Sequence, residues 1–600
     1  MRRRLADRIW QWRKLTYAVS AALVLLVMAA IFLSISLPSE IVTVSSEPTF
    51  FDANRAYRTM QDLARLYPDR TIGTPDAAGA AAWCEGILHD VQIQSTTKTF
   101  EATLGRSTET LRNVTVVMPG QTDDAILVSA PRDDQFQAEA TSPASASGTA
   151  ILLDLVQVFA ARPHEKTLIF ISSEGGSYGG LGVAHFLQTD PRAHDVKVAL
   201  SVQGLGREQR TDLLGGVTGS RTTTPGWYVA LAADTLHQAG LGLQLPPLPD
   251  QIATQDLKVA QGEQVAGLRA GIPSLLLYDR SKDIVTTTGL ATQGAAIERL
   301  ILSLDAGGDI PDSPPTALVL ASGRYLTARA LNILGVLLLL PTAIMAVAWL
   351  IVTRLRPDAW LRYLRNLVSF VLPLAMVVLL ALLFARVGLL PRYPFQATTA
   401  LGTPATTPEL LPTVLLLVLG LAVFVLFRHY LGYLKPSEPL VMAEMGKLSL
   451  GLLVLLAGLA LLATHAPFSL LMGVTAAWIW PLATCFAEPR PVTAPWWPRA
   501  RSNRRLLLLG LIAPVLLYAY LAVALGMGWW SGWWFLLVQT VSGAYGVRGP
   551  AAGVLITSGF LILAGVRRLH LLPIETLDER DELTLIQTPP PRAWSPRPPR

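Results

Sequence analysis

The sequence predicts an α/β outer domain, with a mixed, largely parallel sheet flanked by helices, joined to an α-helical transmembrane bundle of about eight spans. Two observations predict this fold class. First, 51% of the 600 residues are hydrophobic and only 15% are charged, which excludes a wholly soluble chain and a disordered one. Second, long apolar segments occupy the N-terminal end and the region 326–568, whereas strand and helix patterns alternate in the region 38–325.

The segment 17–37 is predicted to be a signal-anchor transmembrane helix. Its apolar run is long enough to cross a hydrocarbon core of ~30 Å, and a basic region, 1–16, precedes it. The run exceeds the apolar part of a typical cleavable signal peptide, and no A-x-A-like cleavage site follows it. Because basic flanks stay in the cytoplasm, we expect the region 1–16 to be cytoplasmic and the region 38–325 to be extracytoplasmic.

The other predicted spans all lie in the C-terminal bundle, at 331–352, 367–383, 411–427, 448–463, 468–487, 506–526 and 551–566. The arginine-rich loops of this region then fall on the cytoplasmic side, as the positive-inside rule requires. We interpret the tryptophan-rich stretch 529–546 as an interfacial or re-entrant piece, with a ninth span as the alternative. A proline-rich cytoplasmic tail, 569–600, completes an integral protein of the plasma membrane or of an endomembrane, with both termini in the cytoplasm.

The outer domain shows five short apolar runs rich in Val, Ile or Leu, which predict strands at 113–118, 125–129, 167–172, 197–203 and 274–278. Apolar residues at helical spacing predict a helix that begins at Ser147-Gly148 and continues through Phe159. Further helices are predicted at 52–66, 76–91, 227–240 and 291–304. Strands that alternate with helices favour a sheet covered on both faces.

Charge and cysteine content exclude other classes of protein. The formal net charge is +6, but the arginines cluster beside apolar segments, which indicates membrane topology rather than nucleic-acid binding. Two cysteines, Cys84 and Cys485, cannot build a disulfide framework or a cysteine metal cluster. We therefore expect membrane lipid, and a membrane protein or a secreted polypeptide, as partners.

Seven segments of the outer domain resemble, in order, the landmarks of the zinc aminopeptidases of peptidase family M28: YPDRTIGTP at 67–75, LRNVTVVMPG at 111–120, ILVSAPRDD at 126–134, SASGTAILLDLVQVF at 145–159, TLIFISSEGGSYGGLGVAHF at 167–186, ALSVQGLGR at 199–207 and AGIPSLLL at 270–277. The resemblance implies a mixed sheet flanked by helices. It also implies two zinc ions held by two His, two Asp and a Glu, with a second Glu as the base.

Matched position by position, the implied zinc ligands and the base are absent. The first His falls on Pro131 and the bridging Asp on Ala144, while the paired glutamates fall on Gly176 and Ser177. The later Asp and the last His fall on two amides, Gln203 and Gln264. Neutral side chains cannot replace anionic and imidazole ligands, so the resemblance implies a degenerate metal site without zinc or another cofactor.

Some acids remain near the expected pocket. Asp133 matches the family's second-shell Asp, and Asp134, Glu174 and Glu263 are expected near the pocket mouth. We expect these acids to be solvated loop residues, with one weakly held divalent ion at Asp133, Asp134 and Glu174 as the alternative. The outer-domain histidines match no ligand position, and His185 is expected to be a packed or surface helix residue.

A serine hydrolase is an enzymatic alternative. Gly175-Gly176-Ser177-Tyr178-Gly179 satisfies G-x-S-x-G between a predicted strand and a predicted helix, the context of a nucleophile elbow. Its triad would need His237 together with one of three aspartates, Asp195, Asp212 or Asp234. Motifs with several glycines arise readily by chance, which favours the aminopeptidase alignment of the same segment.

The order of anchor, peptidase-like domain and multi-span bundle is similar to that of the luminal subunit of the GPI-anchor transamidase. We therefore expect a non-catalytic pseudo-peptidase that binds or presents a polypeptide or lipid-linked substrate to a partner at the outer membrane face. Two alternatives remain open. One is an active membrane-bound hydrolase, either a zinc aminopeptidase with relocated ligands or a serine hydrolase at Ser177. The other is a transporter component, although the predicted spans are nearly free of charged residues.

Overall fold

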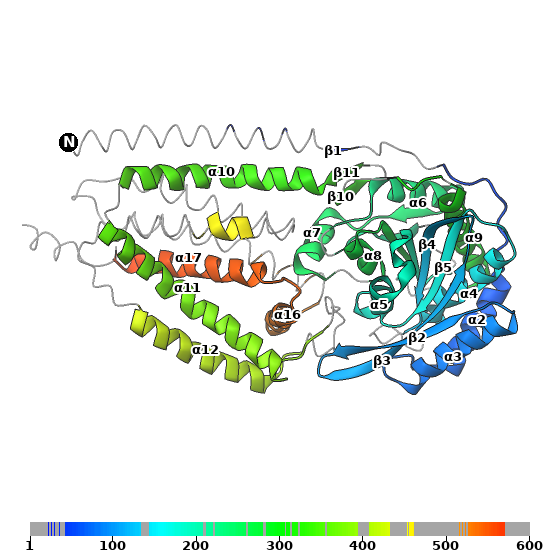
Figure 1. Ribbon diagram of the computed structural model, residues 1–600, viewed down its shortest axis with the longest axis horizontal. Helices are drawn as coiled ribbons and strands as arrows, with labels where there is room; N and C mark the ends of the chain where they lie inside the picture. Colours follow the sequence, from blue (N-terminus) through cyan, green and yellow to red (C-terminus); the bar gives the residue numbers. More distant parts are fainter. Residues whose placement is uncertain are drawn as a thin grey trace, which may run out of the picture.

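The computed structural model describes an α/β domain beside a bundle of long helices (Figure 1). Apart from a few isolated positions, the described residues are 43–133, 143–207, 212–219, 222–259, 262–279, 284–306, 308–311, 315–321, 324–353, 357–393, 407–431 and 526–569. The predicted spans 17–37, 448–463, 468–487 and 506–526 lie wholly or largely outside these residues, as do Asp134 and the tail 569–600 apart from its first residue.

The α/β domain is built on an eight-stranded mixed sheet with the order β2-β3-β5-β4-β6-β9-β7-β8. Its strands are β2 (Thr96–Leu104), β3 (Ser107–Met118), β4 (Thr122–Pro131), β5 (Lys166–Ser173), β6 (Val196–Gln203), β7 (Asp212–Gly216), β8 (Gly242–Gln244) and β9 (Ser274–Tyr278). The four central strands β5, β4, β6 and β9 run parallel, and antiparallel pairs occur toward both edges.

Helices cover both faces of the sheet. On one face pack α2 (Ala53–Leu66), α3 (Pro75–Asp90), α4 (Ser147–Ala160), α6 (Gly226–Gln238) and α9 (Thr287–Ala306). The other face is covered by α5 (Leu181–Thr189) and α8 (Gln264–Ala270). In β4, Ile126 and Val128 enter the first core and Ala125 and Leu127 the second, because successive side chains of a strand point to opposite faces.

A small second sheet connects the domain to the bundle. It has the order β1-β11-β10, formed by β1 (Ile35–Ser36), β10 (Thr316–Ala321) and β11 (Arg324–Thr327). The next helix, α10 (Ala328–Thr353), begins directly where β11 ends. Helix α7 (Leu248–Leu257) packs against β10 on the domain side, where Gln251 Nε2 donates to Val319 O at 2.8 Å. The start of α10 is therefore held by paired backbone rather than by a free linker.

The described part of the bundle contains α10, α11 (Pro357–Arg386), α12 (Leu410–Leu431) and α17 (Arg548–Leu569). These four helices contain the predicted spans 331–352, 367–383, 411–427 and 551–566. Within the described residues, two stretches are long and apolar enough to cross a membrane, Leu367–Arg386 and Leu410–Phe427. The prediction of about eight spans remains a prediction.

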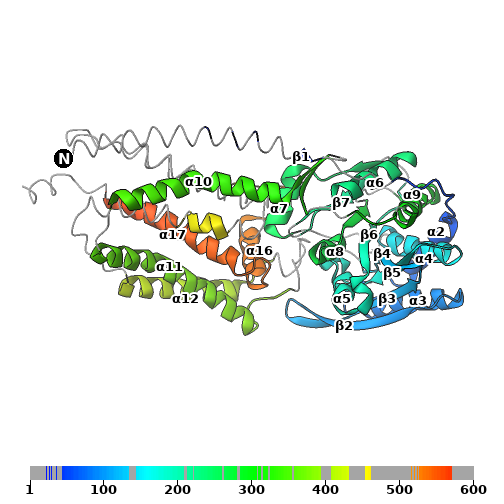
Figure 2. The ribbon, with the colours of Figure 1, turned by 45° about the horizontal axis from the view of Figure 1, so that its top comes forward.

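A short helix, α16 (Trp529–Val541), lies between the bundle and the α/β domain and crosses the direction of the long helices (Figures 1 and 2). Its 13 residues extend about 20 Å, less than the ~30 Å of a hydrocarbon core. Trp529 and Trp530 are largely exposed, whereas Trp534 and Phe535 are fully buried. The helix is too short to be a ninth span by itself, and the interfacial interpretation of this stretch stays a prediction.

The five strands and five helices predicted for the outer domain are all present, with ends shifted by a few residues. The helix predicted after Gly179 is α5, whereas the sequence prediction missed several short or edge elements, namely β2, β7, β8, β10, β11, α7 and α8. Of these, β2 has side chains that are exposed or half-buried along most of its length. Its sequence therefore contains no continuous apolar run that would predict a strand.

Candidate functional site

The candidate site lies at the carboxyl ends of the central parallel strands. In the sheet, Pro131 at the end of β4 pairs with Ser173 at the end of β5. On the other side of β4, Ser129 pairs with Ser201, so that Pro131 and Gln203 each lie two residues further toward the same edge. Open α/β sheets place their ligands at this edge, and the positions matched to zinc ligands are brought to it.

Pro131 fills the space that a side chain at position 176 would need. The 3-10 turn Gly176–Tyr178 follows β5, and a Cβ atom built on Gly176 would lie 2.3 Å from Pro131 Cβ. Real Cβ contacts are never this short, so this backbone accepts only glycine at position 176 while any residue with a Cβ atom occupies position 131. The two matched positions are thus in direct contact, and a side chain at position 176 would require the backbone to shift.

Asp133 holds the backbone of the same turn. Its Oδ1 accepts hydrogen bonds from the amide nitrogens of Gly175 at 2.9 Å and of Gly176 at 3.0 Å. Gly175 has a φ of 89°, a conformation that favours glycine. The Asp133 side chain is buried, and it orients the loop after β5 instead of a histidine ring.

Glu174 is committed to a buried arginine. Its Oε2 lies 3.5 Å from Arg132 Nη2 and accepts the amide of Arg112 at 2.9 Å. Arg132 also donates to Ser172 O at 2.9 Å and to Arg112 O at 2.8 Å. Both charged side chains are 1% exposed, and burial raises the pKa of Glu174 while Arg132 opposes that rise. This pair joins β3, β4 and β5 at the strand ends.

Glu263 is buried next to three serines that end or nearly end the central strands. The Ser173 hydroxyl donates to Glu263 Oε1, and the hydroxyls of Ser129 and Ser201 lie 2.7 Å apart. Burial raises the pKa of Glu263 to about 7, with Ser129 and Ser173 lowering it and the Asp133 charge raising it. A carboxyl group in this environment is neutral through much of the acidic range.

The expectation of solvated acids at a pocket mouth is wrong for the three acids that the structure describes. The exposed fraction is 4% for Asp133 and 1% for both Glu174 and Glu263. Each is held by backbone amides, an arginine or a serine, so none is an ordinary loop acid. The acidic residue types gave no signal of this burial, because acids are mostly exposed.

The remaining matched positions contribute neutral groups. Gln264 is buried at the start of α8, and its Nε2 donates to Thr218 O at 3.3 Å. Gln203 is half-buried, and its Cα would lie 3.2 Å from a Cβ atom on Gly148 at the start of α4. Ala144 lies in the 3-10 turn Pro143–Ala146 before that helix, and the side chains of Ala144 and Ser177 lie outside the described part.

The side chains present do not fit a pair of zinc ions. Across the described ranges, no group of three or more His, Cys, Asp or Glu side chains is placed to hold a metal ion. The position of the paired glutamates is blocked by Pro131, and Asp133 and Glu174 already accept hydrogen bonds from backbone amides. Relocated carboxylates at Asp133 and Glu174 therefore offer no open dinuclear site among these residues.

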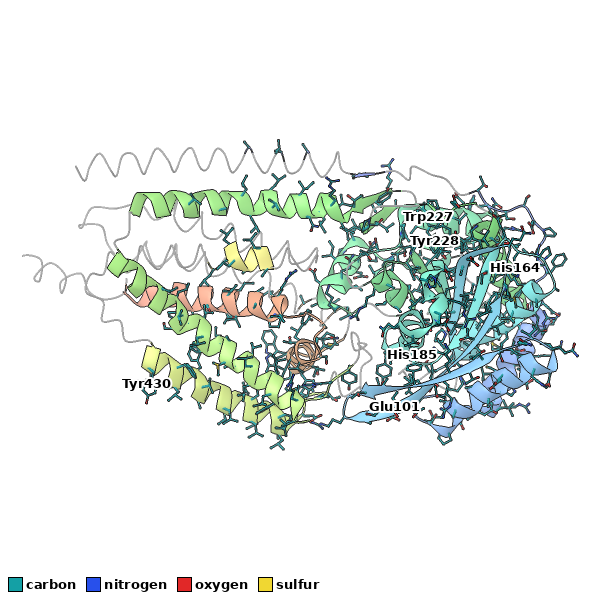
Figure 3. The ribbon with its side chains drawn as sticks, in the orientation of Figure 1. Glu101, His164, His185, Trp227, Tyr228 and Tyr430 are labelled. Carbon is teal, nitrogen blue, oxygen red and sulfur yellow. The ribbon has the colours of Figure 1, made fainter. Side chains whose placement is uncertain are left out.

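The histidines lie away from the strand edge. His185 on α5 stacks on Phe100 with ring centroids 4.3 Å apart, as expected for a packed helix residue. His164 lies well apart from it, and its Nδ1 is 2.9 Å from Lys166 O (Figure 3). His237 ends α6 just before β8, and four strands separate β8 from β5. At ~4.8 Å per strand, that places β8 about 24 Å from the loop containing Ser177.

The aspartates offered for a serine triad are also dispersed. Asp195 directly precedes β6 and therefore lies at the amino end of the parallel strands, whereas Ser177 follows the carboxyl end of β5. Asp234 lies on the exposed side of α6, and Asp212 is exposed at the start of β7. The sheet topology thus separates the members of the triad.

The loop of the candidate site contacts the helical bundle. Tyr178 stacks on Tyr393, with ring centroids 6.4 Å apart and planes at 13°. Both rings belong to one buried cluster that also contains Leu181 of α5, Phe384 of α11 and Trp534 of α16. Burial raises the pKa of Tyr178 above the ordinary range. The site therefore lies on the side of the α/β domain that faces the bundle, a relationship that the sequence did not predict.

Comparison with known proteins decides the kind of domain. Residues 113–284 match the model of peptidase family M28. The α/β domain has an M28-like fold. The match spans β3 to the loop after β9 and includes every candidate site residue that lies on a central strand.

Solved structures similar to the M28-like domain are zinc aminopeptidases and glutaminyl cyclases. The glutaminyl cyclase of an Acidobacteriales bacterium is 15% identical and covers 44% of this chain and 99% of its own, with a TM-score of 0.35. The zinc aminopeptidase of Bacillus subtilis is 11% identical and covers 44% of this chain and 98% of its own, with a TM-score of 0.36. No curated protein matches the chain in sequence.

Proposed function

We propose that this protein is a non-catalytic M28-like membrane protein that binds or presents a polypeptide or lipid-linked substrate to a partner at the outer membrane face. One observation carries the proposal. Pro131 and Gly176, which stand at the matched positions of a histidine ligand and a glutamate, pack so closely that a side chain at position 176 is excluded. A family site would need a shift of the backbone as well as new side chains at both positions, and neither residue has a side-chain atom that binds a metal ion or accepts a proton.

The acids left at the strand ends support the same proposal. Asp133 organises the loop after β5, Glu174 pairs with Arg132, and Glu263 accepts from Ser173. A general base needs a free position within reach of a water or a substrate proton. Glu174 Oε1 and Glu263 Oε2 accept no hydrogen bond among the described residues, but both carboxyl groups are buried and are held through their other oxygen, which favours a structural polar network.

The orientation of the M28-like domain favours a role at the membrane. The candidate loop packs through Tyr178 on the bundle, and Arg106 in the β2–β3 turn donates to Leu389 O and Glu409 Oε2 at 2.8 and 2.6 Å. A ligand held near this loop would lie beside the outer ends of the helices. The proposed arrangement of an anchor, this domain and a multi-span bundle is similar to the luminal subunit of the GPI-anchor transamidase, which suggests presentation of a substrate to a partner enzyme.

The test uses the full chain purified in detergent, assayed against a panel of aminoacyl fluorogenic substrates with and without a chelator. We expect no chelator-sensitive hydrolysis, and no labelling of the chain by a fluorophosphonate probe. Turnover that disappears with the chelator would contradict the proposal in favour of a zinc enzyme. Labelling that is lost in Ser177→Ala and kept in Ser107→Ala, a control serine at the start of β3, would contradict it in favour of a serine hydrolase.

Presentation is tested separately by photo-crosslinking. A photoreactive residue in place of Thr110, which is exposed on β3 two residues before the Arg112 that binds Glu174 of the candidate loop, is expected to capture a membrane or secreted polypeptide in native membranes. The same residue in place of Val91, exposed just after α3, is not. Equal capture at both positions would indicate random contact and would contradict a binding role for the candidate loop.

A further inference from the structure

A cavity of about 610 Å³ lies where β11 runs into α10. Its walls are almost wholly apolar, and the main contributors on α10 are Ile333, Val336 and Leu337. These three residues follow Arg329 at spacings of four, seven and eight, so all four lie on one face of the helix. The volume falls within the ~300–1,000 Å³ of small-molecule sites.

The apolar wall continues as an exposed surface. Ile333 is 52% exposed and Val336 is 54% exposed. Both lie on α10, which runs along the helical bundle (Figure 2). From position 330 to position 353, α10 contains no charged residue. At 1.5 Å per residue, this stretch extends about 36 Å, which is enough to cross a hydrocarbon core. An apolar face of this kind at the domain end of a spanning helix adjoins the outer leaflet.

The cavity changes from apolar to polar toward the domain. Arg329, Asn332 and Thr222 line it at this end, and no acidic residue is among its described lining residues. Arg329 is exposed, and it is the last charged residue before the apolar stretch of α10. A guanidinium group at the boundary between water and hydrocarbon is well placed to bind a phosphate, because its planar donors match phosphate oxygens.

We propose that this cavity, the α10 groove, binds one acyl chain of an anionic phospholipid, with the lipid phosphate at Arg329. The apolar face recognises the chain, and the single positive charge at its domain end recognises the headgroup. The groove begins where the small sheet fixes the start of α10, so that a lipid bound there lies directly beneath the M28-like domain. The inference rests on the membrane insertion in the proposed function and does not depend on the absence of catalysis.

The experiment is native mass spectrometry of the full chain, transferred from nanodiscs that contain equal parts of phosphatidylglycerol and phosphatidylcholine. We expect one retained phosphatidylglycerol per wild-type chain. Val336→Trp fills the groove and is expected to lower retention at least fivefold. The matched control, Val347→Trp, places the same ring on an exposed position three turns further along α10 and is expected to retain lipid as the wild type does.

A second pair of variants tests the headgroup without relying on a filled groove. Arg329→Gln is expected to abolish the preference for phosphatidylglycerol, whereas Arg324→Gln, which removes an equal charge on β11, is expected to preserve it. Wild-type chains without retained lipid would show that another segment, such as the predicted anchor, covers the groove, and would overturn the proposal. Equal retention by Val336→Trp and Val347→Trp, or an unchanged preference in Arg329→Gln, would overturn it too. The hydrolysis assays of the proposed function test the strand edge and not the α10 groove. A failure of the lipid proposal is therefore distinguishable from a failure of the proposed function.

Discussion

The Ser173 hydroxyl donates a hydrogen bond to the Glu263 carboxyl and so joins the end of β5 to the residue before α8. The two residues are 90 positions apart in the sequence and meet only through the order of the sheet. Beside them, Asp133 holds the loop after β5 and Glu174 pairs with Arg132. The edge of the sheet that would carry catalysis is thus a buried network of polar contacts, in which Glu174 Oε1 and Glu263 Oε2 accept no hydrogen bond from the described residues.

Glu263 should make the stability of the M28-like domain depend on pH. Its pKa is raised from 4.5 to about 7, so folding favours the protonated form. The stabilisation is therefore complete below about pH 4.5 and is lost as the pH rises through 7, by an amount on the order of 3 kcal/mol. Glu263→Gln should lose this dependence and should be more stable than the wild type at pH 8 but not at pH 5. Thermal unfolding of the full chain at pH 5 and pH 8 measures the stability difference between the variant and the wild type. An equal difference at the two pH values would contradict this prediction.

Gly176→Ala should destabilise the domain, because its Cβ would lie 2.3 Å from Pro131 Cβ. Overpacking of this kind costs about 1–3 kcal/mol. The control is Gly86→Ala in α3, where a Cβ meets nothing within 4 Å and alanine favours the helix. Combining Gly176→Ala with Pro131→Gly, which removes the Cβ atom that the new methyl group would meet, should recover part of the loss, as measured by chemical unfolding. Additive losses in the double variant would show that the two positions are not coupled by packing.

Removing Arg132 should be more harmful than removing its partner. Arg132→Met leaves the Glu174 carboxylate buried without a positive charge, which costs about 3–5 kcal/mol. Glu174→Gln keeps an acceptor for the Arg112 amide, and it should cost less. Chemical unfolding of both variants tests this order, and an Arg132→Met chain as stable as Glu174→Gln would contradict a structural role for the pair.

Tyr178 and Tyr393 should couple the domain to the bundle. Their rings stack, so a double-mutant cycle of Tyr178→Ala and Tyr393→Ala should give a coupling free energy of about 0.5–1.5 kcal/mol. Tyr178→Phe keeps the ring and should retain most of the coupling free energy. Faster hydrogen exchange in α16 is expected for Tyr178→Ala and not for Tyr178→Phe. A coupling free energy of zero would show that the contact between the loop and the bundle does not stabilise the protein, and would contradict the prediction.

The sequence predicted the central strands because β4, β5, β6 and β9 are short runs of Val, Ile, Leu and Phe with no competing helical period. It missed β2, whose mixed polar pattern reflects an exposed edge. Pro131 and Gln203, which the resemblance matched to zinc ligands, lie at one edge of the sheet by the strand register. The sequence did not predict the burial of Glu174 and Glu263, because charged residues are ordinarily exposed. Only the folded chain shows that Arg132 and Ser173 are their partners.

The zinc content of the full chain, measured by inductively coupled plasma mass spectrometry after dialysis against micromolar zinc, tests the central claim most directly. We predict well under one zinc ion per chain, with no difference between the wild type and Asp133→Asn. Two zinc ions per chain, lost together in Asp133→Asn, would contradict the proposal that the strand edge around Pro131 and Gly176 holds no zinc site.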